Sequence, residues 1–378
     1  MRIEAVDLRR INIPMIAPFR VSFGVEHHRD ILLIRVVADG AEGWGECVAM
    51  SRPLYSPEYV DGAEDVIRRH MLPRLFEAGD VAADQVAEIL RPIHGHPMAK
   101  AALEMAILDT ELRGAGASLA EYLGAVRTEV DCGVSVGIYE DPAELVEAVD
   151  GYLSEGYRRI KLKIEPGHDL DAVSAVRERF PKILLQVDAN TAYTLADASQ
   201  LAKLDEFNLL LIEQPLAEDD VRGHAELARL LRTPVCLDES ITSARSAEYA
   251  IAIGACRVVN IKAGRVGGYL EARRVHDVSA AHGVPVWCGG MLETGLGRAA
   301  NVALAALPNF TLPGDTSASG RYYAQDITEP FVLRDGRLEV PEGPGLGVTP
   351  IQEILDELTT SLRTERPSRP VSRSVVGQ

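Results

Sequence analysis

Charged residues recur along this chain at a nearly constant spacing. Five of them end short apolar runs: Lys163, Asp188, Glu213, Asp238 and Lys262. The first three intervals are 188 − 163 = 25, 213 − 188 = 25 and 238 − 213 = 25 residues, and the last is 262 − 238 = 24. Each interval fits one strand followed by one helix. Repeated units of this kind form a parallel sheet and bring the last residue of every strand to the same end.

Short β-rich runs alternate with amphipathic helices from about residue 129 onwards. Seven or eight such units in this length favour a closed barrel over an open sheet. The fold class is therefore predicted to be α/β, a TIM-like (β/α) barrel with its active site at the carboxyl ends of the strands. The predicted strands cover residues 130–138, 159–164, 183–187, 209–212, 235–237, 258–261 and 286–288, with a weaker eighth candidate at 310–312.

The first third of the chain has a different pattern. Strands predicted within residues 1–50 are followed by helices over residues 57–125, and such segregation indicates an α+β unit. The final residues are rich in Arg, Ser and Pro, which predicts disorder. The predicted domains are a capping domain at 1–125, a barrel at 126–322, a segment at 323–363 that completes the capping domain, and a disordered tail at 364–378.

Charge and cysteine content narrow the possible partners. The chain has 39 Lys and Arg against 56 Asp and Glu, a net charge of −17, which argues against nucleic acid but not against a small anionic substrate. Five cysteines, an odd number without metal-ligand spacing, predict free thiols in a reducing cytoplasm. The sequence shows neither a signal peptide nor an apolar run of membrane-spanning length, so no membrane partner is predicted. A homo-oligomer is expected, as is common for barrel enzymes.

Three acids on adjacent predicted strands indicate a metal site. One Asp after a strand is often only the cap of the next helix. Asp188, Glu213 and Asp238 in register would repel one another and need neutralisation, which a bound cation provides. Ligands that are all oxygen indicate a hard ion, so the predicted cofactor is one Mg²⁺ or Mn²⁺ per subunit.

Two lysines flank these acids. Lys163 ends the second predicted strand and Lys262 the sixth, which lie opposite each other in an eight-stranded barrel. Lys161 precedes Lys163 by two residues and so points to the same side of its strand, although a pair facing solvent is the alternative. A metal stabilises the doubly charged enolate of a carboxylate, and a desolvated lysine takes the proton. The predicted reaction is therefore removal of the proton α to a carboxylate.

Residues 161–163 resemble the K-x-K motif of the muconate-lactonizing subgroup of the enolase superfamily. Residues 188–190, 213–215 and 238–240 resemble the three metal-ligand motifs of that subgroup. Further segments are similar to the N-acylamino acid racemase / o-succinylbenzoate synthase family, namely 45–47 with 53–55, 261–268 and 289–295. One departure is Ala263, where relatives often have proline. The resemblance covers residues 1 to about 360 and implies a modified (β/α)7β barrel under a capping domain.

The resemblance also implies roles for residues around the catalytic lysines. Capping-domain loops would supply an apolar lid, barrel loops would contact the acyl part of the substrate, and polar residues would support the lysines and ligands. The implied lid residues are Phe19, Phe23, Met50 and Tyr55; the implied acyl contacts are Ser135, Gly290, Met291 and Leu292; the implied supporting residues are Asn190, Glu239 and Arg265.

Two reactions of this family use the same two lysines and the same metal site. In racemisation of an N-acylamino acid, such as an N-succinylamino acid, one lysine removes the α-proton and the other returns one to the opposite face. In o-succinylbenzoate synthesis, a step of menaquinone biosynthesis, Lys163 removes the proton and assists loss of hydroxide while Lys262 stabilises the enolate. Arg265, characteristic of the racemase branch, favours racemisation.

Other functions fit the residues less well. The seventh predicted strand lacks the histidine of mandelate-racemase-like enzymes, and Asp315-Thr316-Ser317 has one acid where dipeptide epimerases usually have two. A muconate cycloisomerase and a catalytically inactive barrel that serves as a binding protein both remain open. An inactive barrel would have little reason to keep five buried charges, because unpaired buried charge is costly.

Overall fold

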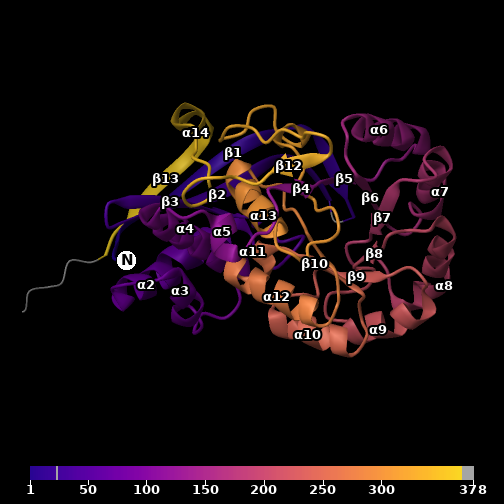
Figure 1. Ribbon diagram of the computed structural model, residues 1–378, viewed down its shortest axis with the longest axis horizontal. Helices are drawn as coiled ribbons and strands as arrows, with labels where there is room; N and C mark the ends of the chain where they lie inside the picture. The colour runs from indigo at the N-terminus through magenta and orange to yellow at the C-terminus, as the bar shows by residue number, and fades with distance from the viewer. Residues whose placement is uncertain (23, 368–378) are drawn as a thin grey trace, which may run out of the picture.

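The computed structural model describes residues 1–22 and 24–367. A capping sheet is built from both ends of the chain, in the order β13-β1-β2-β3, and Figure 1 shows the yellow C-terminal strand beside the indigo N-terminal ones. Positive φ angles at Asp39 and Gly40, of 50° and 78°, permit the tight turn that joins two of these strands. The strands are β1 (Ile3–Val21), β2 (Gly24–Ala38), β3 (Ala41–Cys47) and β13 (Thr359–Glu365).

Helix α4 (Pro97–Ala115) packs against this sheet and is the longest helix of the capping domain. Two glycines of β3 allow the close approach, because a Cβ atom at Gly45 would lie only 2.1 Å from the carbonyl oxygen of Ala102. The helix ends where Gly116 takes up the left-handed conformation with φ of 70°. The other helices here are α1 (Val60–Val66), η1 (Ile67–Met71), α2 (Leu72–Ala78), α3 (Ala83–Ile89) and α5 (Leu119–Leu123).

Seven parallel strands form the second sheet, in the order β11-β10-β9-β8-β7-β6-β5. Consecutive strands are neighbours, and the helices between them lie on the outside of the curved sheet (Figure 1). This arrangement confirms the predicted barrel. The strands are β5 (Gly133–Val136), β6 (Arg159–Lys163), β7 (Leu184–Asp188), β8 (Ile212–Glu213), β9 (Val235–Leu237), β10 (Val258–Ile261) and β11 (Val286–Cys288).

The helices of this half follow the strands in turn. Polar caps start several of them, as where Asp141 accepts a hydrogen bond of 2.8 Å from Ala143 N at the start of α6. The helical elements are α6 (Pro142–Ser154), α7 (Leu170–Arg179), η2 (Leu195–Asp197), α8 (Ala198–Leu201), η3 (Ala202–Phe207), α9 (Val221–Leu230), α10 (Ala244–Ala252), α11 (Ala263–Val266), α12 (Tyr269–Ala281), α13 (Gly295–Ala305) and η4 (Ser319–Arg321).

The barrel closes without a regular eighth strand. Residues 310–312, the weaker strand candidate, form only an isolated bridge from Phe310 to Val286. Further along, Gly133 N donates to Gly314 O at 2.7 Å, and Asp315 N donates to Cys288 O at 2.8 Å. Pro313 has no N–H group, so a continuous ladder is interrupted there. The closing segment therefore joins β11 to β5 by a few hydrogen bonds, in agreement with the (β/α)7β form.

Two boundaries differ from the sequence prediction. The strand predicted at 130–138 is divided, because β4 (Glu129–Asp131) pairs antiparallel with β12 (Arg337–Glu339) while β5 joins the barrel. The predicted tail starts too early, since Thr364 and Glu365 belong to β13 and pair with β1. β1 is 19 residues long, and one of its edges is free to pair with another strand. After α14 (Gln352–Leu358) the chain returns to this edge and forms β13. Residues 368–378 of the predicted tail lie outside the described residues.

All five cysteines are buried and free. Among residues 1–22 and 24–367, no helix has the length and apolar character needed to cross a membrane.

Candidate active site

The carboxyl ends of the barrel strands bring the predicted charged residues together. The parallel register sets Lys163 beside Asp188 and Asp188 beside Glu213 on β6, β7 and β8. Asp238 and Lys262 directly follow β9 and β10. The three acids are completely buried, with 0% of each exposed. The regular spacing in the sequence thus corresponds to one charged group at the same end of each of five adjacent strands.

Lys161 lies at the centre of the buried carboxylates. Its Nζ atom is 3.2 Å from Asp188 Oδ2, 3.1 Å from Glu213 Oε2 and 2.6 Å from Asp315 Oδ2. Burial lowers the pKa of Lys161, but the three carboxylates outweigh that effect and hold the pKa well above its usual range. Lys161 is therefore a fixed buried cation and does not face solvent.

The two other lysines each contact a different acid. Lys163 Nζ donates to Asp188 Oδ2 at 2.7 Å and to Asn190 Oδ1 at 2.6 Å. Lys262 Nζ donates to Asp238 Oδ2 at 2.8 Å and to Tyr55 OH, from the capping domain, at 2.9 Å. Both amines line one cavity, from strands separated by three others. A substrate in that cavity would have an amine available from two sides.

The predicted supporting residues hold these groups in place. Arg265, on α11, forms an ion pair with Asp238 Oδ1, so this carboxylate is shared with Lys262. Asn190 donates to Glu239 Oε1 at 3.0 Å and thereby ties the end of β7 to the segment after β9. The arginine is buried, and a guanidinium this close competes for the carboxylate of Asp238. It can therefore influence how firmly Lys262 is held.

The three acids differ in how their charge is balanced. Burial, together with the nearby Asp188, raises the pKa of Glu213 to about 8. Burial also raises the pKa of Asp238 to about 7, although Lys262 acts in the opposite direction. For Asp188 burial acts upward, but Lys163 and Lys161 outweigh it and hold its pKa well below the usual range. Burial thus opposes the charge of Glu213 and Asp238, although Asp238 is paired with both Lys262 and Arg265.

The donor set fits a hard divalent cation. All three side chains offer carboxylate oxygens, and Glu213 Oε2 is buried with the ammonium group of Lys161 3.1 Å away but accepts no hydrogen bond. Among the described residues, no three His, Cys, Asp or Glu side chains are gathered closely enough to hold an ion as they stand. The ammonium group of Lys161 lies between Asp188 and Glu213, where it already supplies positive charge.

A narrow cavity of about 60 Å³ lies above the charged strand ends, at the junction of the barrel and the capping domain. Eleven predicted site residues line it: Phe19, Met50, Tyr55, Ser135, Lys161, Lys163, Asn190, Lys262, Gly290, Met291 and Leu292. Phe23 lies outside the described residues. The three metal-site acids, Glu239 and Arg265 do not line the cavity, but each contacts a residue that does: the acids contact the lysines, Glu239 contacts Asn190, and Arg265 lies over the ring of Tyr55.

The capping domain also fixes the barrel loop that lines this cavity. Glu46, on β3, accepts hydrogen bonds from Thr294 N at 3.1 Å, Thr294 Oγ1 at 2.7 Å and Gly297 N at 3.0 Å, at the start of α13. Leu292 just before has a strained φ of 60°, and its carbonyl oxygen accepts a hydrogen bond from Tyr323. The loop that carries Met291 and Leu292 is therefore held on one side by Glu46 of β3 and on the other by Tyr323.

Sequence reasoning missed several residues of the site. Asp315 holds Lys161 and also pairs with Arg159 at 2.8 Å, but it follows the irregular closing segment, where the strand pattern is weak. Asn260 donates to Glu213 Oε1 at 2.7 Å. It precedes Lys262 by two residues, so the alternation of side chains along a strand could have identified it. The remaining lining residues are Val21, Glu26 and Tyr322.

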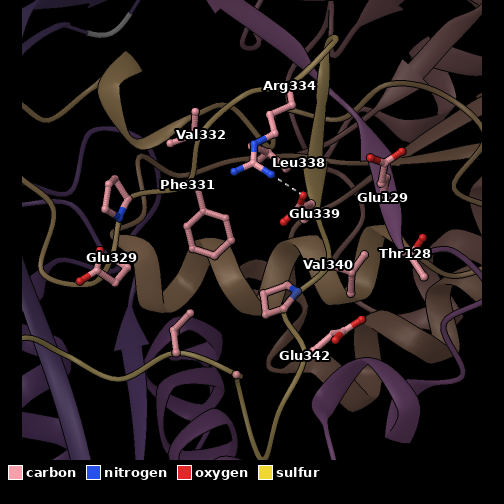
Figure 2. Close-up of a pocket in the computed structure, with 14 residues that line it drawn as sticks. Thr128, Glu129, Glu329, Phe331, Val332, Arg334, Leu338, Glu339, Val340 and Glu342 are labelled. Carbon is pink, nitrogen blue, oxygen red and sulfur yellow. Dashed lines mark hydrogen bonds and ion pairs between the residues drawn. The ribbon is translucent and has the colours of Figure 1, made fainter.

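A second cavity lies between the β4–β12 pair and the segment that follows η4, and Figure 2 shows its lining. Its volume is about 590 Å³, and Glu129, Glu329, Glu339 and Glu342 contribute to its wall. Arg334 donates to Glu339 at 2.8 Å, the dashed line in the figure. None of the predicted catalytic or ligand residues lines it, so the cavity at the barrel mouth is the candidate active site.

Comparisons with known proteins agree with this geometry. Residues 144–354 match the family described as Enolase C-terminal domain-like, and residues 5–124 match the mandelate racemase / muconate lactonizing enzyme N-terminal domain. The chain is 66% identical over 362 residues to an N-succinylamino acid racemase of an Amycolatopsis species, covering 96% of this chain and 98% of that relative. It is 48% identical over 349 residues to an o-succinylbenzoate synthase of Geobacillus kaustophilus, covering 92% and 93%.

A solved structure supports the same assignment. An enolase-superfamily member from Listeria innocua superimposes with a TM-score of 0.94 at 39% identity, covering 97% of this chain and 100% of that one. Both the capping domain and the barrel are therefore shared with that protein. The charged strand ends, the closed barrel and these matches together show that the chain belongs to the enolase superfamily, as an enzyme of the N-acylamino acid racemase / o-succinylbenzoate synthase family.

Proposed function

We propose that this enzyme interconverts the two enantiomers of N-acylamino acids, in particular N-succinylamino acids, and that it also has o-succinylbenzoate synthase activity. One observation carries the proposal: Lys163 and Lys262 line the same cavity from separate strands, and each is held by a different buried carboxylate. Racemisation requires a proton acceptor on one face of the α-carbon and a donor on the other. The racemase relative at 66% identity supports this choice.

The residues around the cavity would have different roles in the reaction. Lys163 would take the α-proton of one enantiomer while Lys262 delivers a proton to the opposite face, with the roles exchanged for the other enantiomer. Lys161 would remain charged and attract the substrate carboxylate. A divalent metal, Mg²⁺ or Mn²⁺, held by Asp188, Glu213 and Asp238 would supply electrostatic stabilisation of the enolate. The capping domain, through Phe19, Met50 and Tyr55, would exclude water.

The dehydration reaction needs the same two lysines in different roles. Lys163 would remove the proton and then assist loss of hydroxide, while Lys262 stays protonated beside the enolate. The synthase relative at 48% identity favours this as a second activity. The ion pair from Arg265 to Asp238 favours the racemase, because it weakens the hold of that carboxylate on Lys262 and leaves the lysine freer to exchange protons.

Exchange of the α-proton in D₂O tests the two-lysine arrangement. Each enantiomer of an N-succinylamino acid is incubated with Lys163→Ala and with Lys262→Ala, and deuterium incorporation and optical rotation are followed. Both variants should lose racemisation, and each should still exchange only the enantiomer whose α-hydrogen faces the remaining lysine. The control is Lys203→Ala, an exposed lysine whose ammonium group donates to Gln200 Oε1 at 3.0 Å.

The outcome separates the candidate functions. Full racemisation by Lys163→Ala would show that the assigned base is wrong. A wild-type protein that binds Mg²⁺ or Mn²⁺ but exchanges no deuterium on any N-acylamino acid would favour the inactive-barrel alternative. A synthase assay run in parallel reports the dehydration activity, and substitution of Arg265 should reduce racemisation more than dehydration.

We also propose that the protein works in the cytoplasm as a homo-oligomer. The five buried free thiols support a reducing compartment. The net charge of −17 supports a small-molecule substrate rather than nucleic acid as its partner.

A further inference from the structure

Arg321, at the end of η4, is a cation without an acidic partner. Among the described residues its guanidinium donates one hydrogen bond, from Nη2 to Ser135 O at 2.9 Å, and no carboxylate lies within ion-pair distance. Its Nε atom is buried without a partner. The side chain as a whole is partly exposed, so water reduces but does not remove the cost of leaving this cation without an anion.

The guanidinium lies directly behind the wall of the active-site cavity. Its carbon is 5.6 Å from the ring centre of Phe19, 5.0 Å from that of Tyr322 and 4.8 Å from that of Tyr152. Phe19 and Tyr322 both line the cavity, as does Ser135. Three contacts of Arg321 thus belong to the wall of the substrate pocket, and two of them are aromatic rings whose faces attract its charge.

Ser135 gives a second, independent sign that a polar group belongs here. The residue is 5% exposed, and its Oγ atom is buried without a hydrogen-bond partner. Ser135 pairs in register with Lys161 on the neighbouring strand, so it lies beside the charged end of the pocket. A ligand that extends from the lysines past Ser135 would reach the wall in front of Arg321.

We infer that Arg321 selects substrates whose acyl group ends in a carboxylate. This rests on the proposed function and assigns to Arg321 the recognition of the distal carboxylate of the N-succinyl group. The α-carboxylate lies at the end with Lys161, Lys163 and Lys262, and the acyl chain runs along Phe19 and Tyr322. The distal carboxylate is then stabilised by the positive charge of Arg321, which acts across the wall formed by Phe19 and Tyr322. Glu26, which also lines the cavity, acts in the opposite direction.

The test compares two substrates that differ only in charge. The same amino acid carries either an N-succinyl group or an N-succinamoyl group, in which a neutral amide replaces the distal carboxylate. Arg321→Met should lower kcat/KM for the succinyl substrate about tenfold relative to the succinamoyl substrate, the order expected for loss of one partly screened charge at this range. Arg321→Lys, which restores the charge, should recover most of the ratio.

Two further variants complete the design. Glu26→Gln, which removes the opposing charge, should raise the succinyl to succinamoyl ratio and gives a reading even where Arg321→Met fails to fold. Arg334→Met removes an arginine of the second cavity that is paired with Glu339, and it should leave the ratio unchanged. This variant controls for loss of positive charge at a distance from the active site.

The outcomes distinguish a failure of the role given to Arg321 from a failure of the proposed function. Equal losses on both substrates in Arg321→Met, or a ratio that does not change, would overturn the selection role and leave the racemase assignment intact. A fall of the ratio in Glu26→Gln would overturn it as well. If the wild-type protein acts on neither substrate, the proposed function itself fails.

Discussion

At the scale of single residues, the site depends on charges that compensate one another out of contact with water. Lys161 has three carboxylate neighbours, and Asp315 binds both Lys161 and Arg159. Arg159 is fully buried and its guanidinium lies 5.1 Å from the ring centre of Trp287. Removing one member of such a group leaves its partners buried and unpaired, which is strongly destabilising.

Asp315 provides a direct test of this dependence. Asp315→Asn should lower the free energy of unfolding by about 3 kcal/mol, because Arg159 loses its carboxylate partner and Lys161 loses the nearest of three. The control is Asp335→Asn, an exposed aspartate with a φ of 49° that asparagine also tolerates. Urea denaturation of both variants measures the effect, and equal stabilities would contradict it.

Individual residues also show which parts of the site could be predicted from the sequence. Equal spacing along the chain indicates one repeated unit of structure. This spacing made it possible to identify Lys163, Asp188, Glu213 and Asp238 from the sequence. Arg321 was not, because it follows an irregular segment and reaches its contacts on Phe19 and Ser135 from distant parts of the chain. Contacts of that kind depend on how the elements cross, and a one-dimensional pattern does not carry that information.

At the scale of elements, the capping sheet and the barrel meet at Glu46 and the start of α13. Burial raises the pKa of Glu46 to about 7, and the nearby Glu293 acts in the same direction, against hydrogen bonds from Thr294 and Gly297 that lower it. The folded state therefore holds this proton more tightly than the unfolded chain does. Between the usual value of 4.5 and about 7, stability must fall as the pH rises.

A pH series on Glu46→Gln isolates this contribution. The wild-type protein should lose roughly 3 kcal/mol of stability from this group between pH 5 and 8, because ionisation is opposed by burial. The variant lacks the titrating group, so its urea midpoint should decline less steeply over the same range. Glu58 and Glu104, whose pKa values burial also raises to about 7, leave a residual slope in both proteins. Identical slopes would rule out the role of Glu46.

Element boundaries were predictable only where local chemistry defines them. The barrel strands end at charged residues, and the predicted positions agree with β6 and β7 closely. The division of 130–138 into β4 and β5 escaped prediction, because it depends on pairing with β12, about 200 residues later in the chain. The start of β13 escaped prediction for the same reason, since its partner is β1.

At the scale of the whole molecule, three strands of one barrel each contribute an acid to the predicted metal site. A cation that binds the folded protein and not the unfolded chain raises stability by mass action, by about 2.7 kcal/mol at a hundred times its dissociation constant. We therefore expect Mg²⁺ or Mn²⁺ to raise the melting temperature of the wild-type protein. Glu213→Gln should lose most of that rise, because a carboxylate ligand becomes a neutral amide.

Calorimetric scans with and without the metal provide the measurement. Glu226→Gln changes an exposed glutamate on α9 in the same way and should keep the full rise. The same rise in Glu213→Gln as in the wild-type protein would remove Glu213 from the ligand set. This readout is independent of turnover, so it tests the ligand assignment apart from the reaction.

The long β1–β2 hairpin has a consequence for how the substrate specificity of such an enzyme can change. Its middle is anchored between β3 and β13, while its far end carries Phe19 and Glu26, paired with each other, to the cavity wall. The lysines and acids that would perform the chemistry lie on other strands altogether. Mutations at the hairpin tip can therefore retune which acyl chains are accepted without disturbing proton transfer, and one catalytic barrel can serve a series of related metabolites.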